Sequence, residues 1–120
     1  MITQQTITAT VATGATGATA DTSFIGGEIL KVAMDVTGNS MDINLDTLGE
    51  QKAQAIIDYT GNTDSTFYPR TPMEDSAGTD VTYDGTNEIY TPFVIYGKLR
   101  LTLASAAEAE TVTMTVTYRT

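Results

Sequence analysis

The chain has 120 residues and no cysteine, so it has the length of one ordinary domain and gains no stability from disulfides. Fifteen acidic against six basic residues give a formal net charge of -9, and a field of this sign opposes binding to nucleic acid or to an anionic membrane surface. Histidine is absent as well, which removes the commonest general base and metal ligand, so we expect no enzyme, no cofactor and no metal.

Targeting and membrane signals are also missing from the sequence. No stretch approaches the roughly 18 to 20 consecutive apolar residues of a membrane span, and the N-terminal residues 1–5 lack the basic and apolar regions of a signal peptide. We therefore expect a chain that is made and used in soluble form.

Threonine dominates the composition, with 24 of the 120 residues, many of them at every second position. Its β-branched side chain suits a pleated, half-exposed surface, so the composition favours β-sheet. At the N-terminus, residues 5–11 alternate between threonine or glutamine and apolar residues and predict a strand. The Gly/Ala/Thr stretch over 13–20 predicts an extended loop or flexible arm, so residues 1–22 are expected to form a strand or an arm.

Two further alternating segments follow. Residues 28–36 predict a half-buried strand in which Leu30, Val32, Met34 and Val36 share one face. A turn over 37–40 precedes a second alternating segment over 41–45, so we expect these two strands to be neighbours in an antiparallel meander.

The middle of the chain is less regular. Residues 50–59 combine helix formers with an Ile-Ile-Asp-Tyr end, and we predict a short strand over 54–59. Residues 61–92 contain all three prolines and are expected to form long loops with one or two short strands. Within them, Asp84-Gly85 is a favoured pair for a type I′ hairpin turn.

The C-terminal segments give the clearest pattern. Residues 93–103 place Phe93, Ile95, Leu99, Leu101 and Leu103 on one face, and residues 111–118 alternate strictly between threonine and apolar residues. The connection over 104–110 is short, so we expect these two strands to form a hairpin. Six or seven short strands without a helix or repeat predict a single all-β domain over 1–120, a small antiparallel β-sandwich of jelly-roll or Ig-like type, with a small β-barrel as the alternative.

Carboxylates gather in one of the predicted loops, and two chemical roles were considered for them. Clustered oxygens can coordinate calcium, but their spacing does not match the twelve-residue calcium loop. An acid and base pair for glycoside hydrolysis would need a cleft and sugar-stacking aromatics, which nothing in the sequence indicates. Surface charge that maintains solubility is the simpler interpretation. The residues concerned are Glu74, Asp75, Asp80, Asp84, Asn87 and Glu88.

A second candidate site is the run Phe67-Tyr68-Pro69-Arg70, which lies among turn-forming residues. Tyrosine, phenylalanine and arginine are enriched at protein interfaces, so we predict that this run, together with Phe24, contacts another protein. The alternative is structural: Phe67 and Tyr68 would cover one end of the core while Arg70 pairs with a nearby acid. Both interpretations hold if one aromatic points inward and the other outward.

The chain resembles a group of small virion proteins of tailed bacteriophages, described as decoration, cement or minor structural proteins. The resemblance covers about residues 24–118 and is strongest at 67–70, at the turn over 82–86, and in the ending over 92–103 followed by 111–113. The chain departs from that pattern in Tyr96 and Lys98 around Gly97 and in its alanine- and glutamate-rich connection over 104–110. These departures weaken the assignment to a subgroup of these virion proteins more than the resemblance to the class as a whole.

The resemblance implies a structural role without catalysis. It implies a capsid decoration or cement protein that binds major capsid protein subunits on the virion surface, is made in the cytoplasm of the bacterial host, and forms a homo-oligomer, for which we expect a trimer. Other virion parts remain open, namely a head-tail adaptor, a tail protein or a head-fibre protein. A carbohydrate- or calcium-binding β-sandwich module is a further alternative, although the chain has no tryptophan for a sugar platform.

Overall fold

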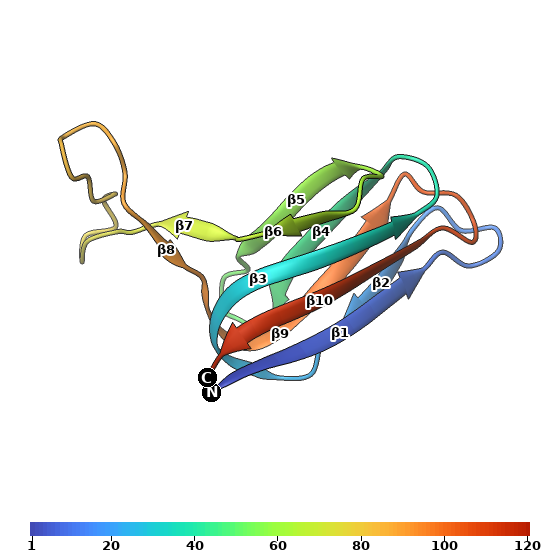
Figure 1. The fold of residues 1–120 in the computed structure, drawn as a ribbon, viewed down its shortest axis with the longest axis horizontal. Helices are drawn as coiled ribbons and strands as arrows, with labels where there is room; N and C mark the ends of the chain where they lie inside the picture. The colour runs from blue at the N-terminus through green and yellow to red at the C-terminus, as the bar shows by residue number, and fades with distance from the viewer.

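The computed structural model describes all residues from 1 to 120 and contains ten β-strands and no helix (Figure 1). In chain order the strands are β1 (Ile2–Thr10), β2 (Ala18–Asp21), β3 (Ile25–Thr37), β4 (Met41–Leu48), β5 (Ala55–Gly61), β6 (Ser65–Phe67), β7 (Arg70–Pro72), β8 (Tyr90–Pro92), β9 (Val94–Ala104) and β10 (Thr111–Arg119). The prediction of an all-β chain is confirmed, as is the uncertain strand over 54–59, which is β5.

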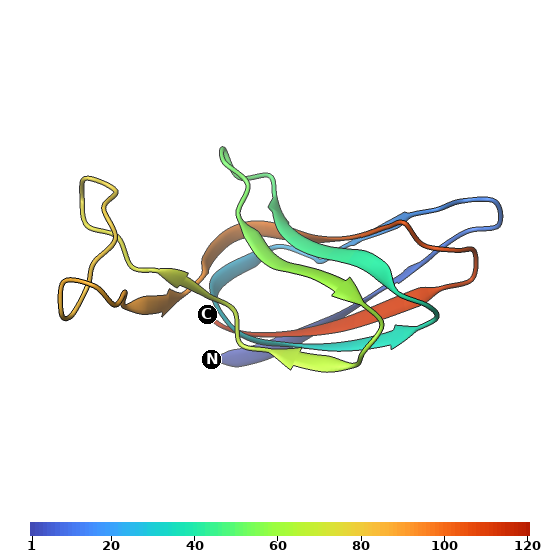
Figure 2. The same ribbon diagram turned by 90° about the horizontal axis from the view of Figure 1, so that it is seen from above.

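Eight strands form one antiparallel sheet that folds over on itself into two layers. Its order is β1-β10-β3-β9-β4-β5, with β2 added beside β9 and β6 beside β3. One layer holds β1, β10, β3 and β6, and the other holds β2, β9, β4 and β5 (Figure 2). The layers are joined where β3 begins, because residues 25–28 pair with residues 94–97 of β9. The predicted small antiparallel sandwich is therefore confirmed, with one side closed as in a barrel.

Apart from β4 and β5, which pair with each other, consecutive strands of the sandwich lie in opposite layers, and this crossing overturns two expectations. The strands over 93–103 and 111–118 are not a hairpin, because β9 pairs with β4 and β2 while β10 pairs with β1 and β3. The expected meander is also wrong, since β3 and β4 do not pair and the turn after Thr37 crosses from one layer to the other. Alternation shows that one face of a strand is buried. Because both layers bury their inner face in the same way, alternation does not show to which layer a strand belongs.

One buried carboxylate ties two of these crossings together. The side chain of Glu110 accepts hydrogen bonds from the backbone N–H groups of Asn39 and Ala107. Glu110 is only 7% exposed, yet it lies in a loop region where the sequence indicates solvent exposure. It serves as an acceptor for loop amides that have no strand partner.

The core lies between the layers and consists of 22 apolar residues. The inner positions of β4, β9 and β10 are those that alternation predicts, and Leu99, Leu101, Val112 and Val116 are fully buried. In β3 the prediction fails at Leu30, which is half-buried, while Ile29 is fully buried. The register slips by one residue between Thr117 and Tyr118, and this bulge reverses the alternation at that point.

Glycine at position 27 allows β3 to pass from one layer to the other. Gly27 has φ +155°, and a Cβ atom built there would lie 2.0 Å from the carbonyl oxygen of Arg119. No other residue fits such a close approach of two backbones. The glycine pair Gly26-Gly27 is therefore the corner of the folded sheet.

The N-terminal segment belongs to the sandwich. Strand β1 pairs with β10 along its whole length, and Ile7, Ala9 and Val11 are buried. The Gly/Ala/Thr stretch turns back into β2, which pairs with residues 100–103 of β9. The strand expected over 5–11 is confirmed, and the low-complexity stretch forms a loop and a short strand.

Between β6 and β9 the chain leaves the sandwich as a narrow projection (Figure 1). Strands β7 and β8 form a separate two-stranded sheet, with Arg70 opposite Pro92 and Pro72 opposite Tyr90. The Cα radius of gyration is 15.5 Å, whereas a compact domain of this length has about 13.5 Å. The region expected to hold one or two short strands has three, and two of them build this projection.

Candidate interaction surface

The projection comprises residues 70–92 and is called the arm, and its outer part, residues 74–88, is called the tip. The end of the sandwich from which the arm leaves is called the base. The base contains residues 22–31, the β4–β5 connection over 49–54, residues 68–69, residues 93–100 and the two chain termini, which lie side by side in Figure 1. The far end holds the β1–β2, β3–β4 and β9–β10 connections.

Three backbone hydrogen bonds organise the root of the tip. The N–H of Met73 donates to the carbonyl oxygen of Ile89 at 2.7 Å, that of Val81 donates to Met73 at 2.7 Å, and that of Ile89 donates to Val81 at 3.0 Å. These bonds divide the tip into two small loops, closed by the bridges between Glu74 and Asp80 and between Thr82 and Glu88. The tip is thus an ordered double loop held by its own backbone.

An aspartate shapes each of these loops. The Oδ1 atom of Asp75 accepts hydrogen bonds from the N–H groups of Ala77 and Thr79 at 2.9 and 3.0 Å. In the second loop, Oδ1 of Asp84 accepts from Thr86 N–H at 2.9 Å and from Asn87 N–H at 2.6 Å. These donors hold the pKa of Asp84 below its usual range.

The conformation at Asp84-Gly85 differs from the predicted type I′ turn. Only Gly85 has a positive φ, +83°, whereas a type I′ turn needs positive φ at both central residues. Tyr83 N–H donates to Asn87 O, so three residues lie between the paired positions. Hydrogen bonds to the Asp84 side chain hold this loop in shape, so a second residue with positive φ is not needed.

The carboxylates of this region do not converge on a common point. No three of the acidic side chains in the chain come close enough together to hold a metal ion. Two of the tip aspartates instead accept hydrogen bonds from their own loops, and Glu74 and Asp80 face solvent. The tip carries five acidic residues, of which Glu88 is half-buried and the other four are exposed.

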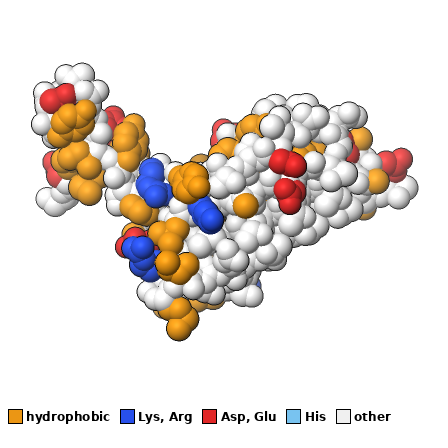
Figure 3. Space-filling view, viewed as in Figure 1, with side chains coloured by type: hydrophobic (Ala, Val, Ile, Leu, Met, Phe, Trp, Pro, Cys, Tyr) orange, Lys and Arg blue, Asp and Glu red, His pale blue; other side chains and the backbone are white.

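Large apolar side chains that are exposed to solvent gather on the arm and the base. Figure 3 shows such side chains along the arm and at the lower corner of the base. None lies in the connections of the far end, where the exposed residues are small or polar. The exposed residues are Met1, Ile2, Phe24, Tyr68, Met73, Tyr83, Tyr90, Val94 and Tyr96. Concentration of apolar surface at one end of a domain is typical of a protein interaction site.

Two of these aromatics form a pair on the base. The ring centroids of Phe24 and Tyr96 are 4.9 Å apart, with the rings nearly perpendicular at 88°. Tyr96 remains 79% exposed, so the pair presents an aromatic surface to solvent. The prediction that Phe24 belongs to an interface stays a prediction, and the structure places it in the exposed aromatic group.

The run from Phe67 to Arg70 divides between the two interpretations. Phe67 packs on the core and contacts the ring of Tyr59 at 5.8 Å between centroids, whereas Tyr68 is 63% exposed. Pro69 is buried. Arg70 contacts no acid and donates from Nη1 to the carbonyl oxygens of Pro69 at 2.7 Å and Leu30 at 3.4 Å. Phe67 therefore covers the core, the expected Arg70 ion pair is absent, and Tyr68 and Arg70 face outward.

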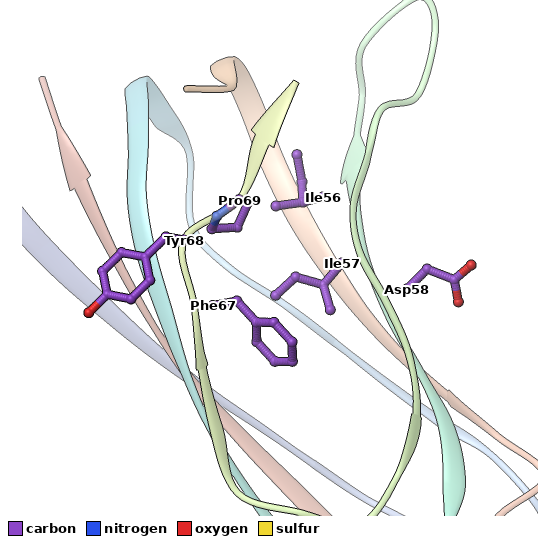
Figure 4. A pocket seen from close by; sticks show the side chains of 6 residues that line it. All are labelled: Ile56, Ile57, Asp58, Phe67, Tyr68 and Pro69. Atoms are coloured by element: carbon purple, nitrogen blue, oxygen red, sulfur yellow. The ribbon is translucent and has the colours of Figure 1, made fainter. Parts of the chain in front are cut away.

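A shallow pocket of about 210 Å³ opens beside this run, at the edge of the sandwich between β5 and β6. In Figure 4, Ile57, Phe67 and Pro69 lie around the same space, while Asp58 and Tyr68 point away from it on opposite sides. The two layers do not pair at this edge, so the inner apolar side chains remain accessible. The pocket is lined by Ile56, Ile57, Asp58, Phe67, Tyr68 and Pro69.

Positive charge is confined to the base, the adjoining part of the sandwich and Arg70 at the root of the arm. In Figure 3 the basic side chains of the visible face lie where the arm joins the sandwich. One ion pair is formed, with Nε of Arg100 2.8 Å from Oδ1 of Asp21, and hydrogen bonding to Arg100 lowers the pKa of Asp21. The six basic residues are Lys31, Lys52, Arg70, Lys98, Arg100 and Arg119.

Several of the exposed side chains were missed in the sequence. Val94 and Tyr96 lie on the outward face of β9, at positions that alternation from Phe93 and Ile95 assigns to solvent. An apolar residue at a position predicted to face solvent is the sequence signal that could have identified these two residues. Tyr83 and Tyr90 gave no comparable signal, because loop residues have no fixed alternation.

Comparison of the chain with protein-family models, with curated proteins and with solved structures found no match. No helix in the structure has the length and apolar character needed to cross a bilayer.

Proposed function

We propose that this chain is a non-enzymatic structural protein of a tailed-phage particle, a capsid decoration or cement protein that attaches to major capsid protein subunits through its arm and base. The observation that carries the proposal is the segregation of exposed apolar side chains. All nine lie on the arm or the base, and the far end has none. The proposal thereby assigns the two ends of the domain different roles, attachment at one and solvent exposure at the other.

The chemistry of this surface suits attachment to a protein. Tyrosine, methionine and arginine are the residue types enriched in the buried centre of interfaces, and the exposed residues Tyr68, Arg70 and Met73 follow closely in sequence where the arm begins. Tyrosine contributes a large contact area at low cost in side-chain entropy. The pocket beside Tyr68 offers space for one apolar side chain of a partner.

The resemblance to phage virion proteins supports the choice of particle. Two of the three segments that carry it, 67–70 and 82–86, form the root of the arm and part of its tip, and the third includes most of β9. The shared segments thus coincide with the candidate surface. A protein at another position in the virion would use the same surface. A binding experiment therefore identifies the virion protein to which this chain attaches.

A binding assay with phage heads tests the proposal. Purified protein is incubated with heads that lack it, and bound protein is quantified after sedimentation. Tyr68 and Tyr96 are both exposed, so Tyr68→Ala with Tyr96→Ala should leave the fold intact. Loss of anchors worth about 2 kcal/mol should weaken binding by roughly 30-fold.

The matched control removes two exposed hydroxyls from the outer face of the sandwich, Thr8→Ala with Thr113→Ala, which form one hydrogen bond at 3.0 Å. This variant should bind heads normally, and thermal unfolding should confirm that both variants are folded. No binding of the native protein to heads, or equal binding of the tyrosine variant and the native protein, would overturn the proposal.

A further inference from the structure

Acidic and basic residues are distributed unevenly between the tip and the base. The tip carries five acidic residues and no basic residue. All six basic residues lie on the base or next to it, as the strand register shows for Lys98 opposite Leu48 and Arg119 opposite Ile2. The far end carries acidic residues only, including Asp35 and Glu108. The tip and the base are therefore opposite in charge character.

The same two regions also match in their apolar groups. At the tip, Tyr83 is 71% exposed and stands beside the carboxylates of the double loop. Beside Tyr68, the pocket is lined mainly by the apolar side chains of Ile56, Ile57, Phe67 and Pro69, while Asp58 at its rim points away from it. Arg70 follows Pro69 in the chain and is exposed. An aromatic ring flanked by carboxylates fits an apolar pocket flanked by a guanidinium, because both the apolar area and the charges are matched.

The tip does not reach the base of its own chain. In Figures 1 and 2 the tip stands clear of the sandwich, separated from it by β7 and β8. The pairing of Arg70 with Pro92 and of Pro72 with Tyr90 holds this stem in an extended form. The complement of the tip must therefore lie on another molecule.

We propose that the tip of one copy docks on the base of a second copy, with Tyr83 against the pocket beside Tyr68 and the tip carboxylates against Arg70. The inference rests on the interaction role proposed above and names a second copy as a partner of that surface. A contact between two different patches is head-to-tail, so repetition closes it into a ring or extends it into a chain.

Self-association of the purified full-length protein tests this contact without phage heads. Sedimentation velocity in 0.15 M NaCl over a concentration series is suitable, because long-range repulsion between copies of charge -9 is screened beyond about 8 Å. The native protein should form species larger than a monomer. Raising the salt to 1 M should weaken association, since charge pairs at the rim of the contact are then screened.

Charge reversal locates the contact. Glu74→Lys with Asp80→Lys changes two exposed tip side chains that make no hydrogen bond, and association should weaken at least about tenfold. The control, Asp35→Lys with Asp42→Lys, makes the same change in net charge away from the tip and should associate at least as well as the native protein. Asp42 is half-buried and accepts a hydrogen bond from the Thr60 hydroxyl at 2.9 Å, so thermal unfolding must first show that this variant is folded.

Mixing variants gives the decisive result. Arg70→Glu alone should also weaken association, because it places a carboxylate against the tip carboxylates at the pocket. A mixture of Arg70→Glu with the lysine tip variant should associate, since the lysines introduced into one tip then face the glutamate introduced at position 70, and the native tip faces the native Arg70. A native protein that stays monomeric at all concentrations would overturn the inference, as would a mixture that fails to associate when both variants are folded. Binding to phage heads is measured in a separate assay. A failure of the self-association proposed here can therefore be told apart from a failure of the proposed attachment to heads.

Discussion

Thr22 and Leu99 form a reciprocal pair at the start of the base: the N–H of Thr22 donates to the carbonyl oxygen of Leu99, and the N–H of Leu99 donates to the Thr22 hydroxyl, each at 2.9 Å. Thr22 is 4% exposed and follows directly after β2. Its hydroxyl therefore extends the pairing between β2 and β9 by one residue, at the point where the backbone after β2 turns away from β9.

Replacing Thr22 by valine keeps the shape of the side chain and removes this acceptor. The buried N–H of Leu99 loses its partner, so the free energy of unfolding should fall by about 1 to 3 kcal/mol. Urea titration followed by circular dichroism measures the change. Thr8→Val is the control, because the Thr8 hydroxyl pairs with Thr113 on the exposed face, and its effect should stay within about 0.5 kcal/mol. Equal values for the two variants would contradict the role given to Thr22.

Gly27→Ala should destabilise the corner of the folded sheet. The added methyl group would lie 2.0 Å from the Arg119 carbonyl oxygen, so one of two paired backbones must move. We expect a loss of at least about 2 kcal/mol, from backbone strain and broken pairing between β3 and β10. Gly49→Ala is the control: its φ is +92° but no atom lies within 4 Å of the new methyl group, so only the conformational cost of about 1 to 2 kcal/mol applies. A smaller loss at Gly27 than at Gly49 would refute this account of the corner.

Asp46→Asn should stabilise the protein at neutral pH. Burial, together with the nearby charge of Asp58, raises the pKa of Asp46 above its ordinary value of 3.8. A carboxyl with a raised folded-state pKa favours the folded state when it is protonated, so this stability is present below pH 3.8 and is lost as the pH rises through the folded-state pKa. Urea titrations should show the advantage of the asparagine variant at pH 7 and its disappearance near pH 3.5. An advantage of the same size at both values would mean that charge is not the cause.

Replacing the whole tip, residues 74–88, by Asn-Gly should leave the sandwich intact. Met73 and Ile89 already form a backbone hydrogen bond, and Asn-Gly closes a two-residue hairpin between such a pair. No residue of the tip is buried. We therefore expect a thermal unfolding transition close to that of the native protein, together with loss of self-association and weaker binding to heads. Unfolding of the shortened protein at ordinary temperature would show that the tip stabilises the domain.

The inner faces of the long strands follow directly from the sequence. Alternation in β4, β9 and β10 identifies the core correctly, because side chains on a strand point to opposite faces in turn. It fails at Leu30, where a bulge changes the register, and bulges depend on the partner strand. In the run predicted to contact another protein, Tyr68 and Arg70 are exposed, while Phe67 and Pro69 belong to the core and its edge. The contact itself stays a prediction.

The sequence by itself determined the long strands, most of their buried faces and the excess of acidic residues, since these depend on residue type and local spacing. Only the tertiary structure decided that most consecutive strands of the sandwich lie in opposite layers, that Gly27 forms the corner between the layers, and that residues 70–92 stand away from the core as an arm. The physical reason is that pairing is a relationship between distant segments. Both layers of a sandwich bury the same alternating pattern, so a strand satisfies its pattern equally well beside either neighbour, and the whole set of packed contacts selects one arrangement.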